Sequence, residues 1–210
     1  MTRAVAAPAA SRWRATPAQL LRLLAGLWLF GTGEALLVTA GLGNTPWTVL
    51  AQGVSLHAPL SIGTATLVIG LLVLCGWLPL RERPGLGTVS NVVVIAVAID
   101  VMLPLLAVPP AMAARAAVLL CGLLVIGAGS GLYLSAELGP GPRDGWMTGL
   151  HGRFGWPLSS VRLGIETAVL AAGWALGGTV GVGTAVFALL IGPAVGMGVT
   201  VLRRRPGQAR

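Results

Sequence analysis

The sequence predicts an all-α protein that crosses a membrane several times, and three observations support this fold class. The chain of 210 residues is 55% hydrophobic and 10% charged, with a mean hydropathy of +0.86, values that are rare for a soluble domain. Its apolar residues form long runs separated by short polar segments. Part of the chain also recurs 96 residues later, which is typical of an internal duplication.

A helix needs about 20 apolar residues to cross a bilayer. We expect six crossing helices, at 20–42, 59–80, 86–108, 112–138, 157–177 and 182–202. The first run continues for about 20 residues and no small-residue cleavage site follows it, so we expect it to be retained as a span.

The arginines predict the orientation. With six spans drawn, twelve of the 14 basic residues fall on one side, Arg115 falls on the other and Arg162 lies within a span. The positive-inside rule then places both termini in the cytoplasm. The net charge of +8 is divided among short clusters between apolar runs, so we exclude nucleic acid as a partner.

The internal repeat divides the chain into two units. "GTGEALLVTAGLGNTPWTVLAQG" at 31–53 aligns with "GAGSGLYLSAELGPGPRDGWMTG" at 127–149, and "GLGT" at 85–88 aligns with "GVGT" at 181–184. We expect a cytoplasmic tail at 1–19, three-helix units at 20–108 and 109–202, and a second cytoplasmic tail at 203–210. An odd number of spans per unit makes the two repeats inverted, as in many secondary transporters.

Both units contain a Gly/Pro-interrupted segment after their first span. Pro46 and Pro142 suit a first helical turn, where a backbone N–H would have no partner. We expect short half-helices at 46–53 and 143–150, which either enter the protein or lie at the membrane surface. The second segment alone carries a charged pair, Arg143 and Asp144, with a planar guanidinium suited to carboxylate or phosphate and an aspartate suited to a helix N-terminus.

Ionisable side chains within spans are costly, so each needs a partner, water or a function. Glu34 lies near the middle of the first span, as a protonatable group in a polar cavity or as a hydrogen-bonded link between helices. Asp100, in the third span, is a second candidate, with a helix-packing hydrogen bond as the alternative. Arg162 and Glu166 are four residues apart on one helix face, either as a structural ion pair or as a site where Arg162 binds an anionic group.

The motifs "LGNTPWTVL", "PGLGTVSN" with "AID", "GPRDGWMTGLH", "VRLGIETAVLAAGWALGGTVGVGT" and "IGP" resemble the YczE/YitT-like integral membrane proteins of bacteria. The resemblance covers about residues 20–200 and implies a multi-pass plasma-membrane protein, in a family where most members have no established activity. The recurrent features of the family map to Pro142, Arg143, Asp144, Gly145, Arg162 and Glu166.

No nucleophile with a base, metal-ligand cluster or phosphate loop is present, so we expect neither an enzyme nor a cofactor. The favoured hypothesis is a small secondary transporter or permease in the lipid bilayer, with a charged central site. Its substrate is an unidentified small molecule, an anionic one if Arg162 binds it. The site residues are Glu34, Asp100, Arg143, Asp144, Arg162 and Glu166. The alternative is a non-transporting membrane scaffold that binds a partner, and the sequence leaves the oligomeric state open.

Overall fold

The computed structural model describes residues 12–203, and these form helices and connecting loops without strands. The predicted tails therefore lie mostly outside the described residues. The helices are α1 (Pro17–Ala40), α2 (Pro46–His57), α3 (Ile62–Cys75), α4 (Trp77–Leu80), α5 (Leu86–Met102), the 3₁₀ helix η1 (Leu103–Leu105), α6 (Met112–Ser135), α7 (Pro142–Phe154), α8 (Leu158–Ala175) and α9 (Val182–Arg203).

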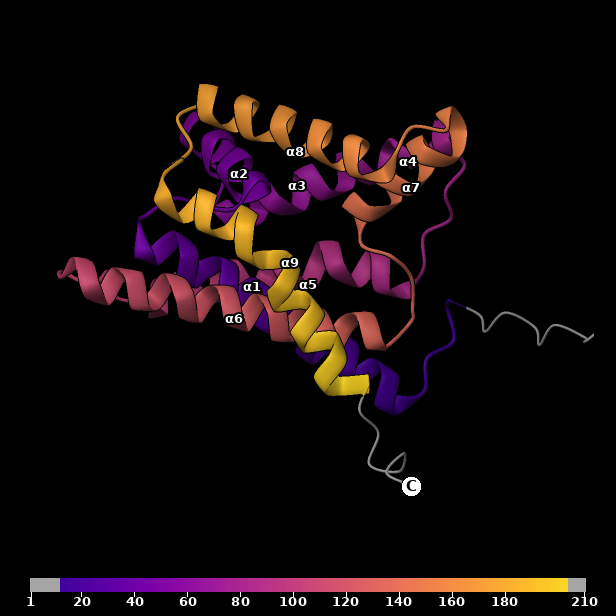
Figure 1. Ribbon diagram of the computed structural model, residues 1–210, viewed down its shortest axis with the longest axis horizontal. Coiled ribbons are helices and arrows are strands. Elements are labelled where there is room, and N and C mark those ends of the chain that lie inside the picture. The colour runs from indigo at the N-terminus through magenta and orange to yellow at the C-terminus, as the bar shows by residue number, and fades with distance from the viewer. Residues whose placement is uncertain (1–11, 204–210) are drawn as a thin grey trace, which may run out of the picture.

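Figure 1 shows these helices in two layers. The lower layer contains α1, α5 and α6, the upper layer contains α2, α3 and α8 with the short helices α4 and α7, and α9 runs obliquely from the upper layer to the lower one. The most extensive packing joins α1 to α6 at the centre of the lower layer. The first unit of the repeat therefore packs against the second through their first helices.

Five helical segments are long and apolar enough to cross a membrane: Pro17–Ala40, Ile62–Leu80, Leu86–Leu105, Met112–Ser135 and Val182–Thr200. They correspond to five of the six predicted spans. The sixth prediction, at 157–177, corresponds to α8, which is less apolar because it contains two serines and the Arg162–Glu166 pair. The two predicted half-helices are present but longer than expected, as α2 and α7.

The helix starts repeat at the predicted offset. The first residues of α2, α3 and α5 are followed exactly 96 positions later by those of α7, α8 and α9. Backbone conformation repeats as well, since six of the seven residues with positive φ in the described part of the chain occur in pairs with this spacing: Gly41 with Glu137, Gly43 with Gly139, and Arg81 with Gly177. Gly155 has no such counterpart. The duplication thus extends from sequence to local structure.

Contacts between the two units are exchanged in the same way. Thr88 Oγ1 donates a hydrogen bond to the carbonyl of Pro140 at 2.8 Å. Thr184, 96 positions after Thr88, donates to the carbonyl of Asn44, 96 positions before Pro140, at 2.9 Å. Two units related by a two-fold axis make exchanged contacts of this kind. The inverted placement of the units in a membrane stays a prediction, because it depends on the topology.

Backbone bonds follow the same exchange. The N–H of Gly87 donates to the carbonyl of Leu138 at 2.9 Å, and the N–H of Gly183 donates to that of Leu42 at 2.7 Å. Both members of each pair are 96 positions from their counterparts. These four residues join the start of the last helix of one unit to the loop before the half-helix of the other.

Small residues allow the close crossing of α1 and α6. A Cβ atom on Gly129 would stand 2.6 Å from the carbonyl oxygen of Gly26, and one on Gly33 would stand 2.7 Å from that of Gly122. Gly33 and Gly129 are repeat equivalents, as are Gly26 and Gly122. This crossing therefore tolerates no side chain at either pair, as in other close helix contacts in membranes.

We expect Gly129→Ala to destabilise the protein by about 1–3 kcal/mol, because the added Cβ meets backbone atoms that can move only if α1 and α6 separate. Thermal unfolding of the purified protein in detergent measures this as a lower Tm. Gly164→Ala on α8 is the matched control, since no atom lies within 4 Å of its Cβ position. Equal Tm values for the two variants would contradict the proposed role of the crossing.

Candidate functional site

Glu34 lies in the middle of the protein, where α2 begins. Its side chain is 1% exposed and accepts a hydrogen bond from Thr48 Oγ1, which lies 2.7 Å from Oε2. Thr45 Oγ1 lies 3.1 Å from the same oxygen, and Thr45 is also the N-cap of α2. Glu34, Thr45 and Thr48 are all buried, so the start of α2 lies inside the protein. The structure thus supports a half-helix that enters the protein at its N-terminal end.

Arg143, in the first turn of α7, faces its own repeat equivalent. The guanidinium carbon Cζ lies 4.8 Å from the centre of the Trp47 ring, and Trp47 precedes Arg143 by 96 positions. This cation–π contact brings the first turns of α2 and α7 together near the axis that relates the two units. Glu34 and Asp144 are close enough to Arg143 to interact with it electrostatically.

A cavity of about 470 Å³ opens beside these residues, and we call it the α8–α9 cavity. Its polar lining includes four of the predicted site residues: Arg143, Asp144, Arg162 and Glu166. Thr45 also lines it, so Glu34 lies directly behind the cavity wall. The structure therefore brings together five of the six predicted residues around one cavity.

The cavity lies where the packing of the two units differs. In the first unit, α3 packs against α5. In the second unit the equivalent helices α8 and α9 hardly touch within the described residues, and side chains of both line the cavity. Figure 1 shows α9 running obliquely from the α8 layer towards α1 and α6.

The Arg162–Glu166 pair forms the exposed edge of the cavity. Arg162 Nε lies 3.0 Å from Glu166 Oε1, with the two side chains 54% and 31% exposed. Both side chains line the cavity in addition to contacting each other. Both groups are therefore available to a ligand.

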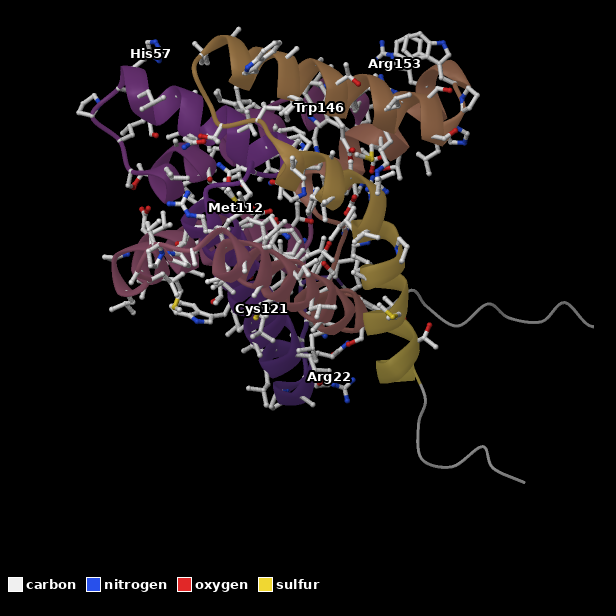
Figure 2. The ribbon with its side chains drawn as sticks, turned by 60° about the vertical axis from the view of Figure 1, so that its left-hand side comes forward. Arg22, His57, Met112, Cys121, Trp146 and Arg153 are labelled. Atoms are coloured by element: carbon white, nitrogen blue, oxygen red, sulfur yellow. The ribbon has the colours of Figure 1, made fainter. Side chains whose placement is uncertain are left out.

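Burial and neighbouring charges change the pKa values of Arg143 and Asp144, the charged pair of α7. Burial raises the pKa of Asp144, and the neighbouring Arg143 guanidinium offsets part of that rise. Burial lowers the pKa of Arg143, while Glu34 and Asp144 raise it. The two groups thus depend on each other to remain charged. Trp146, labelled in Figure 2, holds α7 against α3 by donating from Nε1 to the Val73 carbonyl at 2.7 Å.

Asp100 is not among the residues that line the α8–α9 cavity. Its carboxylate accepts from the backbone N–H of Gly63 at 2.7 Å, and from the hydroxyls of Ser61 at 2.5 Å and Thr64 at 3.3 Å. These four residues, the Asp100 clamp, attach the N-terminus of α3 to α5. The geometry corresponds to the packing hydrogen bond that was the alternative for this residue.

The second unit lacks this clamp. Gly196 occupies the position equivalent to Asp100, and no atom lies within 4 Å of its Cβ position. The N-terminus of α8 has no side-chain cap, whereas Ser61 caps α3. Two differences accompany the separation of α8 from α9. Gly196 supplies no carboxylate, and Ser159 stands at the position of Gly63, where a Cβ atom would clash with the Ala96 carbonyl oxygen.

Sequence reasoning missed several residues of the site. Thr45 and Thr48 bind Glu34, Trp47 contacts Arg143, and Ser130 and Tyr133 line the cavity. The offset of 96 contained a signal for two of them, because Ser130 is the equivalent of Glu34 and Trp47 that of Arg143. In residues 12–203, no three His, Cys, Asp or Glu side chains are grouped in a way that would hold a metal ion.

Comparisons with known proteins connect this architecture to uncharacterised membrane proteins. An uncharacterised protein of Haemophilus influenzae is 41% identical over 198 residues, which are 94% of this chain and 91% of that protein. The "uncharacterized membrane protein YczE" of Bacillus subtilis is 35% identical over 171 residues, covering 80% of this chain and 79% of YczE. No solved structure matches the chain. The model of the "Family of unknown function (DUF6198)" matches residues 17–199, so the chain belongs to this family of YczE-like membrane proteins.

Proposed function

We propose that the protein is a small secondary transporter whose substrate binds in the α8–α9 cavity. The observation that supports this most is the cavity itself, because four charged side chains from α7 and α8 meet there beside the buried Glu34. A non-transporting scaffold would need those charges only for helix packing, and a cavity of about 470 Å³ at that place does not serve packing. The proposal includes binding and movement but no chemical step.

The proposed topology has six spans, with α8 as the fifth in order. Its 18 residues extend over about 27 Å at 1.5 Å per residue, close to the hydrocarbon thickness of a bilayer. Figure 1 shows α8 along the same long direction as α1 and α6. Both termini then lie in the cytoplasm of a bacterium, and α2 and α7 enter the protein from opposite faces.

The difference between the units suggests how the site alternates. In the structure, α3 and α5 are packed and α8 and α9 are apart. If α8 packed against α9 while α3 separated from α5, the α8–α9 cavity would close. An equivalent cavity would then open between α3 and α5, on the other side of the Arg143–Trp47 contact. Movement of one repeat against the other around a central site is the usual form of alternating access in inverted-repeat transporters.

Cysteine accessibility tests this proposal. Ser130→Cys places a thiol in the cavity with almost no change in volume, in a background where the native cysteines are replaced (Cys75→Ser and Cys121→Ser). We expect a membrane-impermeant thiol reagent to label it from either side, in intact cells and in inside-out vesicles. Ala35→Cys, at a fully buried position on α1, is the unreactive control. Labelling of Ser130→Cys from one side only, or from neither, would contradict alternating access.

A further inference from the structure

We propose that the ligand of the α8–α9 cavity is an amphiphile with a zwitterionic head group, one that carries a phosphate and an ammonium, and that it enters sideways between α8 and α9. This inference rests on the proposed function and specifies its substrate class. Three properties of the cavity support it: its unequal walls, its open side and its balance of charge.

The walls of the cavity differ in polarity. The α7 and α8 side presents Arg143, Asp144, Arg162 and Glu166, whereas α9 presents Phe187, Ile191, Gly192 and Val195. A purely polar solute would leave the α9 wall in contact with water, and a purely apolar one would leave the charges without partners. A ligand with a charged end and an apolar end satisfies both walls.

The cavity is open along the gap between α8 and α9. Arg162 and Gly192, on opposite sides of the gap, are both exposed, and no atom lies within 4 Å of the Gly192 Cβ position. The outer surfaces beside the gap carry exposed Leu163 on α8 and exposed Leu189 on α9. Because both helices are proposed spans, this gap faces the hydrocarbon of the bilayer, from which an acyl chain can enter.

The volume agrees with partial enclosure. About 470 Å³ is in the range of pockets that hold ligands of drug size, and it is too small for a complete two-chain lipid. The head group and the first part of a chain would fill it. The remaining chain would extend through the gap into the bilayer.

Charge balance favours a head group without net charge. The ionisable groups around the cavity are Glu34 on α1, Tyr133 on α6, Arg143 and Asp144 on α7, and Arg162 and Glu166 on α8. Three carboxylates oppose two guanidinium groups, and the N-termini of α2 and α7 beside Glu34 and Asp144 contribute about half a positive charge each. The sum is close to zero, so a net anion or a net cation would add an unbalanced charge at low dielectric.

The exposed ion pair provides a complementary site for both signs of charge. The planar guanidinium of Arg162 can bind two phosphate oxygens, and the Glu166 carboxylate can accept from an ammonium group. A head group with both signs of charge can replace their mutual contact without leaving either side chain unpaired at low dielectric. The anionic group expected at Arg162 is then one half of the zwitterion.

Photolabelling of the purified full-length protein in detergent tests the inference. The probe is phosphatidylethanolamine with a photoreactive acyl chain, and the competitors are phosphatidylethanolamine, net-anionic phosphatidylglycerol and chain-free phosphoethanolamine. We expect labelled peptides from 187–195 and competition by phosphatidylethanolamine at concentrations about tenfold lower than by phosphatidylglycerol, with no competition by phosphoethanolamine. Equal competition by phosphatidylglycerol or by phosphoethanolamine would overturn the inference.

Variants provide the second arm of the test. We expect Arg162→Ala and Glu166→Gln each to reduce labelling about tenfold. Arg22→Ala should label as wild type, because Arg22 is exposed on α1 at the end of the molecule away from α8 (Figure 2). Unchanged labelling of both cavity variants would overturn the inference. If the lipid probe labels the protein but Ser130→Cys does not react from both sides, transport is refuted and the zwitterionic ligand is not. If Ser130→Cys reacts from both sides but the lipid probe does not label the protein, the zwitterionic ligand is refuted and transport is not.

Discussion

The double variant Ser159→Gly, Gly196→Asp is expected to close the α8–α9 cavity and to slow labelling of Ser130→Cys at least about tenfold. The new carboxylate would stand where Asp100 stands in the first unit, and its Cβ position is free of neighbours. Ser159→Gly removes a Cβ atom for which the equivalent Gly63 has no room, because it would clash with the Ala96 carbonyl oxygen. Two of the three donors of the Asp100 clamp then have equivalents at the start of α8: the backbone N–H of residue 159 and the hydroxyl of Ser160. Hydrogen bonds to a charged group contribute about 1.5–3 kcal/mol each, so two are sufficient for a tenfold change in population.

The control for this prediction is Ser159→Gly, Gly196→Ala, which adds the Cβ at 196 without the carboxylate and should label at the wild-type rate. The reciprocal variant Asp100→Gly removes the acceptor of three hydrogen bonds and should release α3 from α5. If Ser159→Gly, Gly196→Asp labels as fast as this control, the absence of the clamp is not the reason why α8 and α9 lie apart.

Glu34→Ala is expected to lower the free energy of unfolding by about 3 kcal/mol. The substitution leaves the buried hydroxyls of Thr45 and Thr48 without their carboxylate acceptor and removes one of the negative charges beside Arg143. Removal of one partner from a buried charged network typically costs about 3–5 kcal/mol. Equilibrium unfolding of the purified protein in mixed detergent micelles measures the change.

Two variants control for the loss of volume and of hydrogen bonds. Glu34→Gln keeps an acceptor for the threonine hydroxyls, so we expect it to cost about half as much as Glu34→Ala. Ser130→Ala changes the repeat equivalent of Glu34, where no carboxylate is lost, and should cost less than about 1 kcal/mol. If Glu34→Ala unfolds with the wild-type free energy, Glu34 is not part of a stabilising network.

The helical class and the repeat could be predicted because they depend on local properties. Apolar runs predict spans, Pro46 and Pro142 predict helix starts, and the offset of 96 predicts that α7 begins where it does. The exception among the spans is α8. Its ion pair lowers its hydropathy, so composition alone separates it from the other five.

The candidate site could be predicted only in part. The charged residues were identified because charges are rare in apolar segments, and five of the six surround one cavity. Asp100 differs because its partners, Ser61, Gly63 and Thr64, come from another helix start, and no sequence pattern places that start beside α5.

The cavity itself could not be predicted from the repeat. Two similar sequences predict similar units, and the separation of α8 from α9 is a difference between them. The relevant substitution, glycine at 196 where the first unit has Asp100, is visible in the alignment at offset 96. Its meaning depends on knowing what Asp100 binds, which the structure provides.

The difference between the units can be measured with two matched pairs of spin labels. Labels at Leu163 and Leu189 report on α8 and α9, and labels at Leu67 and Val93, their equivalents in the first unit, report on α3 and α5. Pulsed electron paramagnetic resonance of the protein in lipid gives the distance distribution of each pair. We predict two populations for each pair, with the longer α8–α9 distance accompanied by the shorter α3–α5 distance. The double variant Ser159→Gly, Gly196→Asp should shift the α8–α9 pair to its shorter value. A single distance for both pairs, unchanged in this double variant, would contradict alternation of the two units.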